Sequence, residues 1–281
     1  MPIETNVETP SVCLLGGPDA VSQRYAAEGC LSSPFAFDEK LIDAAAEDTR
    51  RVIASGKRRA QDLWRRSPAI KALACDAGVL SFLSKLYGRR AFPFQTLSFV
   101  KGSEQKPHAD TFHFSSTPER MMCGVWIALE KADEANGPLV YYPGSHRLPV
   151  YAPADVGGGD YATNYEPFVA AELSKGRFGR KEALMKKGEA FLWSANLFHG
   201  GAPIRDCSRT RLSLVTHYFF DDCTYVTPMR EKDGKAHTRE VYDIAAGRFV
   251  RQKRNGAVVR PSPIVALAAR YRNLTRQAPV S

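Results

Sequence analysis

The spacing of apolar residues changes at about residue 92 of this chain. Before that point apolar side chains recur every three to four residues, which is typical of amphipathic helices. The predicted helices cover residues 20–28, 38–55 and 68–87. Asp38 can cap the second helix, Pro68 suits the first turn of the third, and Gly88 suits its end. The pattern breaks around Gly78, so this third segment is either one helix or two.

Beyond residue 92, short apolar and β-branched segments alternate with turn residues, which predicts strands. The predicted strands are Phe94–Val100, Cys123–Leu129, Leu139–Tyr142, Ala190–Trp193 and Thr210–Phe219. Helices followed by many strands indicate a mainly β core with helices packed on one face. Residues 151–185, rich in Gly, Tyr and Ala, interrupt the strands; they are either a lid over a site or an ordinary surface insertion.

Length and composition favour one domain. The 281 residues suit a single large β domain, with a helical part over about 1–90, a β core over about 91–225 and a basic segment over about 245–281. The six cysteines form no C-x-x-C pair, which argues against a zinc ribbon or a disulfide framework. With neither a secretory signal nor a long apolar run in the sequence, we expect a cytoplasmic protein with reduced thiols.

Positive charge is concentrated at the C-terminal end. The net charge is +9, and residues 245–281 contain eight Arg or Lys and no Asp or Glu. This segment could meet a phosphorylated substrate, a membrane surface or nucleic acid, or it could simply be solvated, which is the commoner case. Within it, residues 264–274 have helical apolar spacing; such a helix lies on a membrane or, as we expect here, packs on the domain.

Two histidines and one carboxylate form a candidate metal site. His108 and Asp110 occur as H-A-D, and His199 follows about ninety residues later in F-H-G-G. Alternation along a strand would point His108 and Asp110 to the same side. This is the ligand set of the non-haem Fe(II) oxygenases, which leaves three positions open on one face of the metal. A lone H-x-D also suits a polar surface turn, so the later histidine strengthens the interpretation.

An arginine follows the second histidine, at Arg209 or Arg211. On the predicted strand, Arg211 shares one face with Ser213, Val215 and His217. An arginine in a β core needs an anion, because an unpaired buried charge is costly. A bidentate carboxylate is its natural partner, either from a dicarboxylate co-substrate or from an internal Asp or Glu.

Together these motifs resemble the phytanoyl-CoA dioxygenase family of Fe(II)- and 2-oxoglutarate-dependent oxygenases. The motifs are H-A-D, N-G-P-L-V-Y-Y-P-G-S-H-R over Asn136–Arg147, F-H-G-G and R-T-R-L-S-L, and the resemblance covers residues 25–220. It implies a double-stranded β-helix, a cupin-like jelly-roll barrel with flanking helices. It also implies Fe(II), 2-oxoglutarate and O₂ as cofactor and co-substrates, with iron held by His108, Asp110 and His199.

The resemblance extends to the co-substrate pocket. Arg211 would bind the far carboxylate of 2-oxoglutarate, because it stands six residues before His217, as the family arginine stands before a similar histidine. Trp126 and Leu97 match pocket-lining positions. One position departs from the family: a small hydroxyl residue often stands two places after the second histidine, whereas this chain has Gly201. We expect that contact to be lost or replaced.

The remaining histidines of the β region have structural alternatives. We interpret His146, in P-G-S-H-R, as a residue that stabilises a turn. His113 is either structural or a substrate contact. His217 is either a hydrogen-bond partner of the metal ligands or a satisfied core histidine.

The function predicted from these features is hydroxylation of a small organic, lipid or sugar-like substrate, with release of succinate and CO₂. Asp110 argues against halogenation, because halogenases of this fold typically have Gly or Ala there. Desaturation or ring formation at the same site is the alternative among enzymes, and a non-catalytic jelly-roll binding module is the alternative of another class. The basic tail favours an anionic substrate. No groove of interleaved basic and aromatic residues indicates nucleic acid, and the sequence does not predict the oligomeric state.

Overall fold

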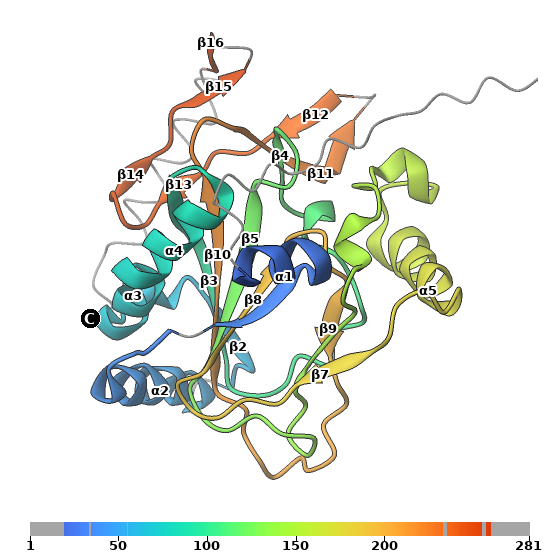
Figure 1. Ribbon diagram of the computed structural model, residues 1–281. Helices are drawn as coiled ribbons and strands as arrows, with labels where there is room; N and C mark the ends of the chain where they lie inside the picture. Colours follow the sequence, from blue (N-terminus) through green and yellow to red (C-terminus); the bar gives the residue numbers. More distant parts are fainter. Residues whose placement is uncertain (1–19, 34, 55, 233–234, 255–256, 260–281) are drawn as a thin grey trace, which may run out of the picture.

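A six-stranded antiparallel sheet forms the centre of the fold (Figure 1). The computed structural model describes residues 20–33, 35–54, 56–232, 235–254 and 257–259. In pairing order, the strands of this sheet are β1 (Cys30–Ser33), β8 (Ala190–Ser194), β5 (Met122–Ala128), β10 (Ser213–Phe220), β3 (Ala91–Phe99) and β2 (Arg59–Gln61). The predictions for β3, β5, β8 and β10 are confirmed, with ends that differ by three residues or fewer.

The two edge strands, β1 and β2, lie in the gaps between the predicted helices and were not predicted. They contain four and three residues, too few to show an alternating pattern. They exist because they pair with β8 and β3 and extend the sheet at both edges. Their formation therefore depends on tertiary pairing and not on local sequence preference.

Four helices precede β3, and they are α1 (Ala20–Glu28), α2 (Glu39–Ala54), α3 (Pro68–Ala74) and α4 (Ala77–Tyr87). Helices α2, α3 and α4 lie on one face of this sheet, and α1 packs beside β1 at its edge (Figure 1). Asp38 caps α2 as predicted, because its Oδ1 accepts a 2.9 Å hydrogen bond from the main-chain nitrogen of Leu41. The third predicted segment is two helices, and the break falls at Cys75 and Asp76 instead of Gly78; Asp76 caps α4.

Apolar side chains of the helices and of one sheet face form a common core. Ile42, Leu73 and Leu83 from the helices belong to the same buried cluster as Leu214 and Tyr218 of β10. Burial of such side chains stabilises the fold by roughly 1.5–3 kcal/mol each. The helices thus seal one face of the sheet and leave the other face to the site.

A smaller antiparallel sheet packs against that other face. It contains β7 (Lys181–Ala183), β6 (Leu139–Tyr141) and β9 (His199–Gly201). Trp126 and Val215 of the large sheet share a buried cluster with Leu139 and Ala183 of the small one. Two facing antiparallel sheets with helices outside confirm the predicted fold class, mainly β with flanking helices and a jelly-roll arrangement.

The other elements are short and extend the rim of the core. The remaining strands are β4 (Ser115–Thr117), β11 (Thr224–Lys232), β12 (Lys235–Thr238), β13 (Tyr242–Asp243), β14 (Arg248–Phe249), β15 (Gln252–Arg254) and β16 (Ala257–Val259). The 3₁₀ turns are η1 (Leu63–Arg65), η2 (Asp110–Phe112), η3 (Ser145–Arg147) and η4 (Pro153–Val156). The segment 151–185 also holds a π-helical turn, η5 (Tyr161–Tyr165), and helix α5 (Glu166–Ser174).

Two further observations concern the membrane and the tail. Among the described residues, no helix is both long enough and apolar enough to cross a bilayer. The predicted helix over 264–274 lies outside the described residues.

Candidate functional site

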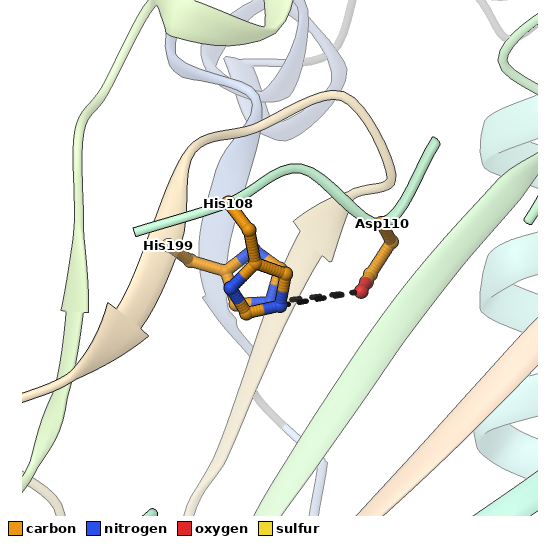
Figure 2. Close-up of side chains that lie close together, drawn as sticks. All are labelled: His108, Asp110 and His199. Carbon is orange, nitrogen blue, oxygen red and sulfur yellow. Dashed lines mark ion pairs between the residues drawn. The ribbon is translucent and has the colours of Figure 1, made fainter. Parts of the chain in front are cut away.

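Main-chain pairing brings His108 and His199 together. The two residues form an isolated antiparallel bridge, with N–H···O distances of 2.8 and 2.9 Å. His199 begins β9, and Asp110 begins the turn η2 directly after His108. One ligand atom from each of the three side chains lies within 4.8 Å of the others, and all three residues are buried. Figure 2 shows the three side chains converging on one point.

The expectation that a regular strand aligns His108 and Asp110 was wrong in its detail. Only His108 pairs as a strand residue, and the chain turns into η2 at Asp110. The turn nevertheless directs the carboxylate to the same side as the imidazole, because Oδ1 lies 3.8 Å from Nε2 of both His108 and His199.

Both imidazoles present Nε2 to the site. Nδ1 of His108 lies 3.0 Å from the carbonyl oxygen of Lys106, and Nδ1 of His199 lies 3.0 Å from that of Leu197. A carbonyl oxygen only accepts, so Nδ1 donates and Nε2 of the neutral ring carries the lone pair. Such bonds fix the orientation of metal-ligating histidines.

The charge state of the cluster suits a metal cation. Burial lowers the pKa of His108 to about 3, so its ring is neutral near pH 7. Burial would raise the pKa of Asp110, but His199, His217, His108 and the Trp193 hydrogen bond outweigh it and lower this pKa to about 2. A buried ionised carboxylate beside the neutral ring of His108 is costly unless a cation neutralises it. The donor set therefore fits a divalent transition metal.

Trp193 holds the other carboxylate oxygen of Asp110, and His217 lies near that oxygen without a hydrogen bond to it. The indole Nε1 of Trp193 donates a 2.8 Å hydrogen bond to Oδ2, and Nε2 of His217 lies 3.8 Å from the same oxygen. Nδ1 of His217 in turn lies 3.0 Å from Oε1 of Gln95. His217 thus lies beside Asp110 while its hydrogen bond goes to Gln95, so its role as a partner of the metal ligands stays a prediction. Trp193 was missed from the sequence, although a tryptophan in the strand before His199 must find a partner for its N–H when buried.

Arg211 is a buried cation that lacks a carboxylate partner within the described residues. It is 6% exposed, its Nη1 donates a 3.2 Å bond to Ser213, and its Nε has no partner. Burial lowers its pKa to about 10. The guanidinium carbon lies 5.7 Å from the ring centroid of Phe99 and 5.3 Å from that of Trp126. The internal salt bridge considered as an alternative is thus not found for Arg211 in this part of the chain.

Arg209 has the opposite environment. Its guanidinium forms two hydrogen bonds to the carboxylate of Asp133, of 2.8 and 3.1 Å, and its side chain is 37% exposed. Of the two candidate arginines, Arg211 therefore has the free donors that an anion requires.

One cavity of about 80 Å³ connects the metal cluster with Arg211. Its lining includes the three candidate ligands and both pocket residues expected from the sequence, Leu97 and Trp126. Nε1 of Trp126 is buried without a partner, like Nε of Arg211. Two unsatisfied donors at one end and a metal-binding cluster at the other fit a small molecule with a carboxylate at its far end.

Gly201 stands where family members often have a hydroxyl residue, and Ser103 fills the space beside it. A Cβ atom placed on Gly201 would lie 2.6 Å from Oγ of Ser103 and 2.7 Å from the main-chain nitrogen of Glu104. Ser103 and Gly201 both line the cavity. A serine hydroxyl is thus present at this wall, but residue 103 carries it instead of residue 201.

The segment 151–185 supports the metal ligands from outside. The hydroxyl of Tyr165 accepts a 2.9 Å hydrogen bond from the main-chain nitrogen of Ala109, between the two ligands of H-A-D. Its ring stacks on Phe112 with centroids 4.0 Å apart. Tyr161 stacks on His113 at 5.0 Å. The segment therefore packs beside the site.

His146 lies in the turn η3, and its Nε2 is 3.0 Å from the carbonyl oxygen of Ala26. This contact joins the turn to α1, as a turn-stabilising histidine should.

The fold is that of non-haem, 2-oxoglutarate-dependent enzymes. The carbocyclase SnoK from nogalamycin biosynthesis, described as non-haem and α-ketoglutarate-dependent, superposes with a TM-score of 0.62 at 16% identity, over 74% of this chain and 86% of that chain. EctD from S. alaskensis, crystallised with 2-oxoglutarate and 5-hydroxyectoine, gives a TM-score of 0.59 at 19% identity, over 76% of this chain and 81% of that chain. At these identities the likeness concerns the fold.

The chain belongs to the phytanoyl-CoA dioxygenase (PhyH) family, whose model matches residues 26–210. This confirms the resemblance. Peroxisomal phytanoyl-CoA dioxygenase of Rattus norvegicus is 28% identical over 149 residues, 53% of this chain and 43% of that protein. The probable phytanoyl-CoA dioxygenase of Caenorhabditis elegans is 30% identical over 153 residues, 53% of this chain and 47% of that protein. The chain thus matches about half the length of these relatives.

Proposed function

We propose that the protein is an Fe(II)- and 2-oxoglutarate-dependent dioxygenase that hydroxylates a small organic, lipid or sugar-like molecule. The observation that carries this proposal is the single cavity that joins the cluster of His108, Asp110 and His199 to the unpaired guanidinium of Arg211. Structures of the same fold contain Fe and 2-oxoglutarate, and the donors of this chain suit both.

In this proposal each residue has a defined task. His108, Asp110 and His199 hold the iron, and Arg211 binds the far carboxylate of 2-oxoglutarate through its free N–H groups. Leu97 and Trp126 form part of the wall of the cavity between the iron ligands and Arg211, and they exclude water from it. When bound, iron and 2-oxoglutarate would activate O₂, of which one oxygen atom ends in succinate as CO₂ is released and the other in the hydroxyl group of the product.

The protein supplies orientation before any reaction. Trp193 fixes one oxygen of Asp110, and the two carbonyl bonds fix both imidazole rings. The metal face that remains open is set by these contacts. A site arranged in advance in this way needs little rearrangement when the co-substrate binds.

Desaturation or ring formation at the same site is a second candidate. The same fold serves the carbocyclase SnoK and the epimerase SnoN as well as EctD, so the fold does not select the outcome. A non-catalytic module is less well supported, because it has no use for a complete donor set beside an unpaired buried arginine.

The test is an anaerobic titration of the metal-free protein with Fe(II) and then 2-oxoglutarate, followed by the weak visible charge-transfer band of the chelate. We expect the band in the wild type, its loss in Asp110→Ala, and a weakened affinity for 2-oxoglutarate in Arg211→Gln. Arg209→Gln is the matched control, since Arg209 is paired with Asp133, and should titrate like the wild type. Absence of both bound iron and the band in the wild type would refute the proposal in favour of a binding module.

A further inference from the structure

A second arginine, Arg239, lies half-buried near the metal ligands without a carboxylate partner in the described residues. It directly follows β12, and its Nη1 is 3.4 Å from the hydroxyl of Thr227. No described Asp or Glu oxygen lies within 4.0 Å of it, and burial followed by repulsion from Arg230 lowers its pKa to about 10. The guanidinium of Arg239 can therefore bind an anion without breaking an ion pair with a described residue; the carboxylate of Asp62 acts on it only from a distance.

Aromatic rings connect Arg239 to the metal cluster. The guanidinium carbon lies 4.5 Å from the ring centroid of Phe114, whose ring is 5.3 Å from that of His217. His217 in turn lies 3.8 Å from Asp110, between Nε2 and Oδ2. Arg239 therefore stands two rings away from a metal ligand.

Arg239 and Arg211 have different surroundings near the metal cluster. Arg211 lines the cavity that contains the candidate ligands, whereas Arg239 does not line it. The ring of Phe114, which lies against Arg239, contacts His217 of β10. His217 follows Arg211 by six residues, which corresponds to about 20 Å of extended chain. Arg211 thus lies just before β10, whereas the rings beside Arg239 contact the middle of that strand at His217.

The cavity beside Arg211 is too small for a second organic molecule. Its volume of about 80 Å³ compares with roughly 300–1,000 Å³ for typical ligand pockets. A primary substrate therefore needs space outside this cavity. On the side of Phe114, the half-buried His113–Tyr161 stack offers further aromatic surface, whereas Phe94, 5.8 Å from the Arg239 guanidinium, is buried.

We propose, on the basis of the proposed function, that Arg239 binds a carboxylate of the primary substrate while the apolar body of that substrate crosses Phe114 toward the metal. The substrate class is then an acid with an apolar chain or ring. Arginine suits this task because its planar N–H groups bind a carboxylate bidentately while its face rests on an aromatic ring. The alternative is that Arg239 only stabilises the packing of Phe94 and Phe114.

Matched acid and amide probes separate these alternatives. Octanoate and octanamide, and 4-phenylbutanoate and 4-phenylbutanamide, differ only in the charged group. We would measure their dissociation constants for anaerobic protein loaded with Fe(II) and 2-oxoglutarate, for the wild type, Arg239→Gln, Arg239→Lys and Arg230→Gln. Arg230 is the control because it is an exposed arginine of β11 that repels Arg239.

We expect the wild type to bind at least one acid about tenfold more tightly than its amide, as for a hydrogen bond to a charged group. Arg239→Gln should remove the difference, Arg239→Lys should keep part of it, and Arg230→Gln should keep most of it. Equal binding of acid and amide by the wild type, or a preference that survives in Arg239→Gln, would overturn the proposal.

The charge-transfer band provides the control for folding and for the proposed function. Arg239→Gln should show the wild-type band with 2-oxoglutarate, because Arg239 does not touch that cavity. If the band were absent from every protein, the proposed function would fail, whereas the comparison of acid with amide, repeated on the metal-free protein, would still report on Arg239.

Discussion

Nε1 of Trp193 donates a 2.8 Å hydrogen bond to Oδ2 of Asp110, and the other oxygen of the same carboxylate, Oδ1, faces the two histidines. The bond gives the two carboxylate oxygens different roles: Oδ2 is hydrogen-bonded within the protein, and Oδ1 is free to bind a metal. Asp110 thus becomes a ligand with one defined direction.

We expect Trp193→Phe to lower the affinity for Fe(II) by about 10- to 100-fold, as is usual when a hydrogen bond to a metal ligand is lost. Anaerobic calorimetric titration with Fe(II) measures this directly. Trp64→Phe is the control, because Nε1 of Trp64 bonds to Asp62 in another part of the molecule. Wild-type iron affinity in Trp193→Phe would show that the bond does not orient the ligand.

Gly124 of β5 makes room for the same indole ring. A Cβ atom at Gly124 would lie 2.3 Å from Cζ2 of Trp193, so the ring must move away from its place. We expect Gly124→Ala to cost about 1–3 kcal/mol of unfolding free energy and to weaken iron binding.

The control for this substitution is Gly179→Ala, because nothing lies within 4 Å of a Cβ atom at Gly179. The effects of Gly124→Ala and Trp193→Phe on iron affinity should not add, since both act through one hydrogen bond. Full additivity, measured by calorimetry on the double variant, would contradict this explanation.

Ser103 lines the cavity at the place where a Cβ atom on Gly201 would lie. We expect Ser103→Ala to raise the dissociation constant of 2-oxoglutarate by about tenfold, which corresponds to one hydrogen bond to a charged group. Gly201→Ser should do more harm, because its Cβ would also meet the main-chain nitrogen of Glu104 at 2.7 Å. Titration of the charge-transfer band, with the exposed Ser208→Ala as control, tests both; unchanged affinity in Ser103→Ala would exclude a role for its hydroxyl.

His146 makes stability depend on pH. Burial lowers its pKa from 6.5 to about 4, so below pH 6.5 the unfolded chain binds a proton that the folded chain does not bind until about pH 4. The contribution of His146 is therefore fully present above pH 6.5 and is lost as the pH falls toward 4. We expect His146→Gln to reduce the loss of unfolding free energy between pH 7 and 4.5 by roughly 2 kcal/mol.

Urea unfolding of the metal-free protein at the two pH values measures this loss. The comparison uses the difference between pH values and not the absolute stability, because the substitution also removes the contact with Ala26. An identical pH dependence in the wild type and in His146→Gln would show that His146 is not buried in its neutral form.

The parts of the site that are local in sequence could be predicted. H-A-D places two donors within three residues, and the F-H-G-G motif marks His199. The alternating pattern around Arg211 correctly indicated a buried side chain. In the helices, the cap at Asp38 could be read because capping involves residues only three apart.

The parts that depend on distant pairing could not be predicted. The bond from Trp193 to Asp110 joins residues 83 positions apart, and the bond from Ala109 to Tyr165 joins residues 56 apart. Strands β1 and β2 exist only as edges of a sheet whose other strands lie elsewhere in the chain. The turn at Asp110 was misjudged because a single bridge to His199, and not a regular strand, fixes the ligand pair.

Under the proposed function, the buried guanidinium of Arg211 would make the stability of the fold depend on the concentration of 2-oxoglutarate. A ligand that binds only the native state stabilises it by mass action, by about 2.7 kcal/mol when its concentration is a hundred times its dissociation constant. For this protein the ligand would also neutralise a charge that the fold otherwise leaves desolvated. A cell rich in 2-oxoglutarate would thus keep more of the protein folded and protected from proteolysis, and a fall in that metabolite would shorten the lifetime of the protein as well as slow its reaction.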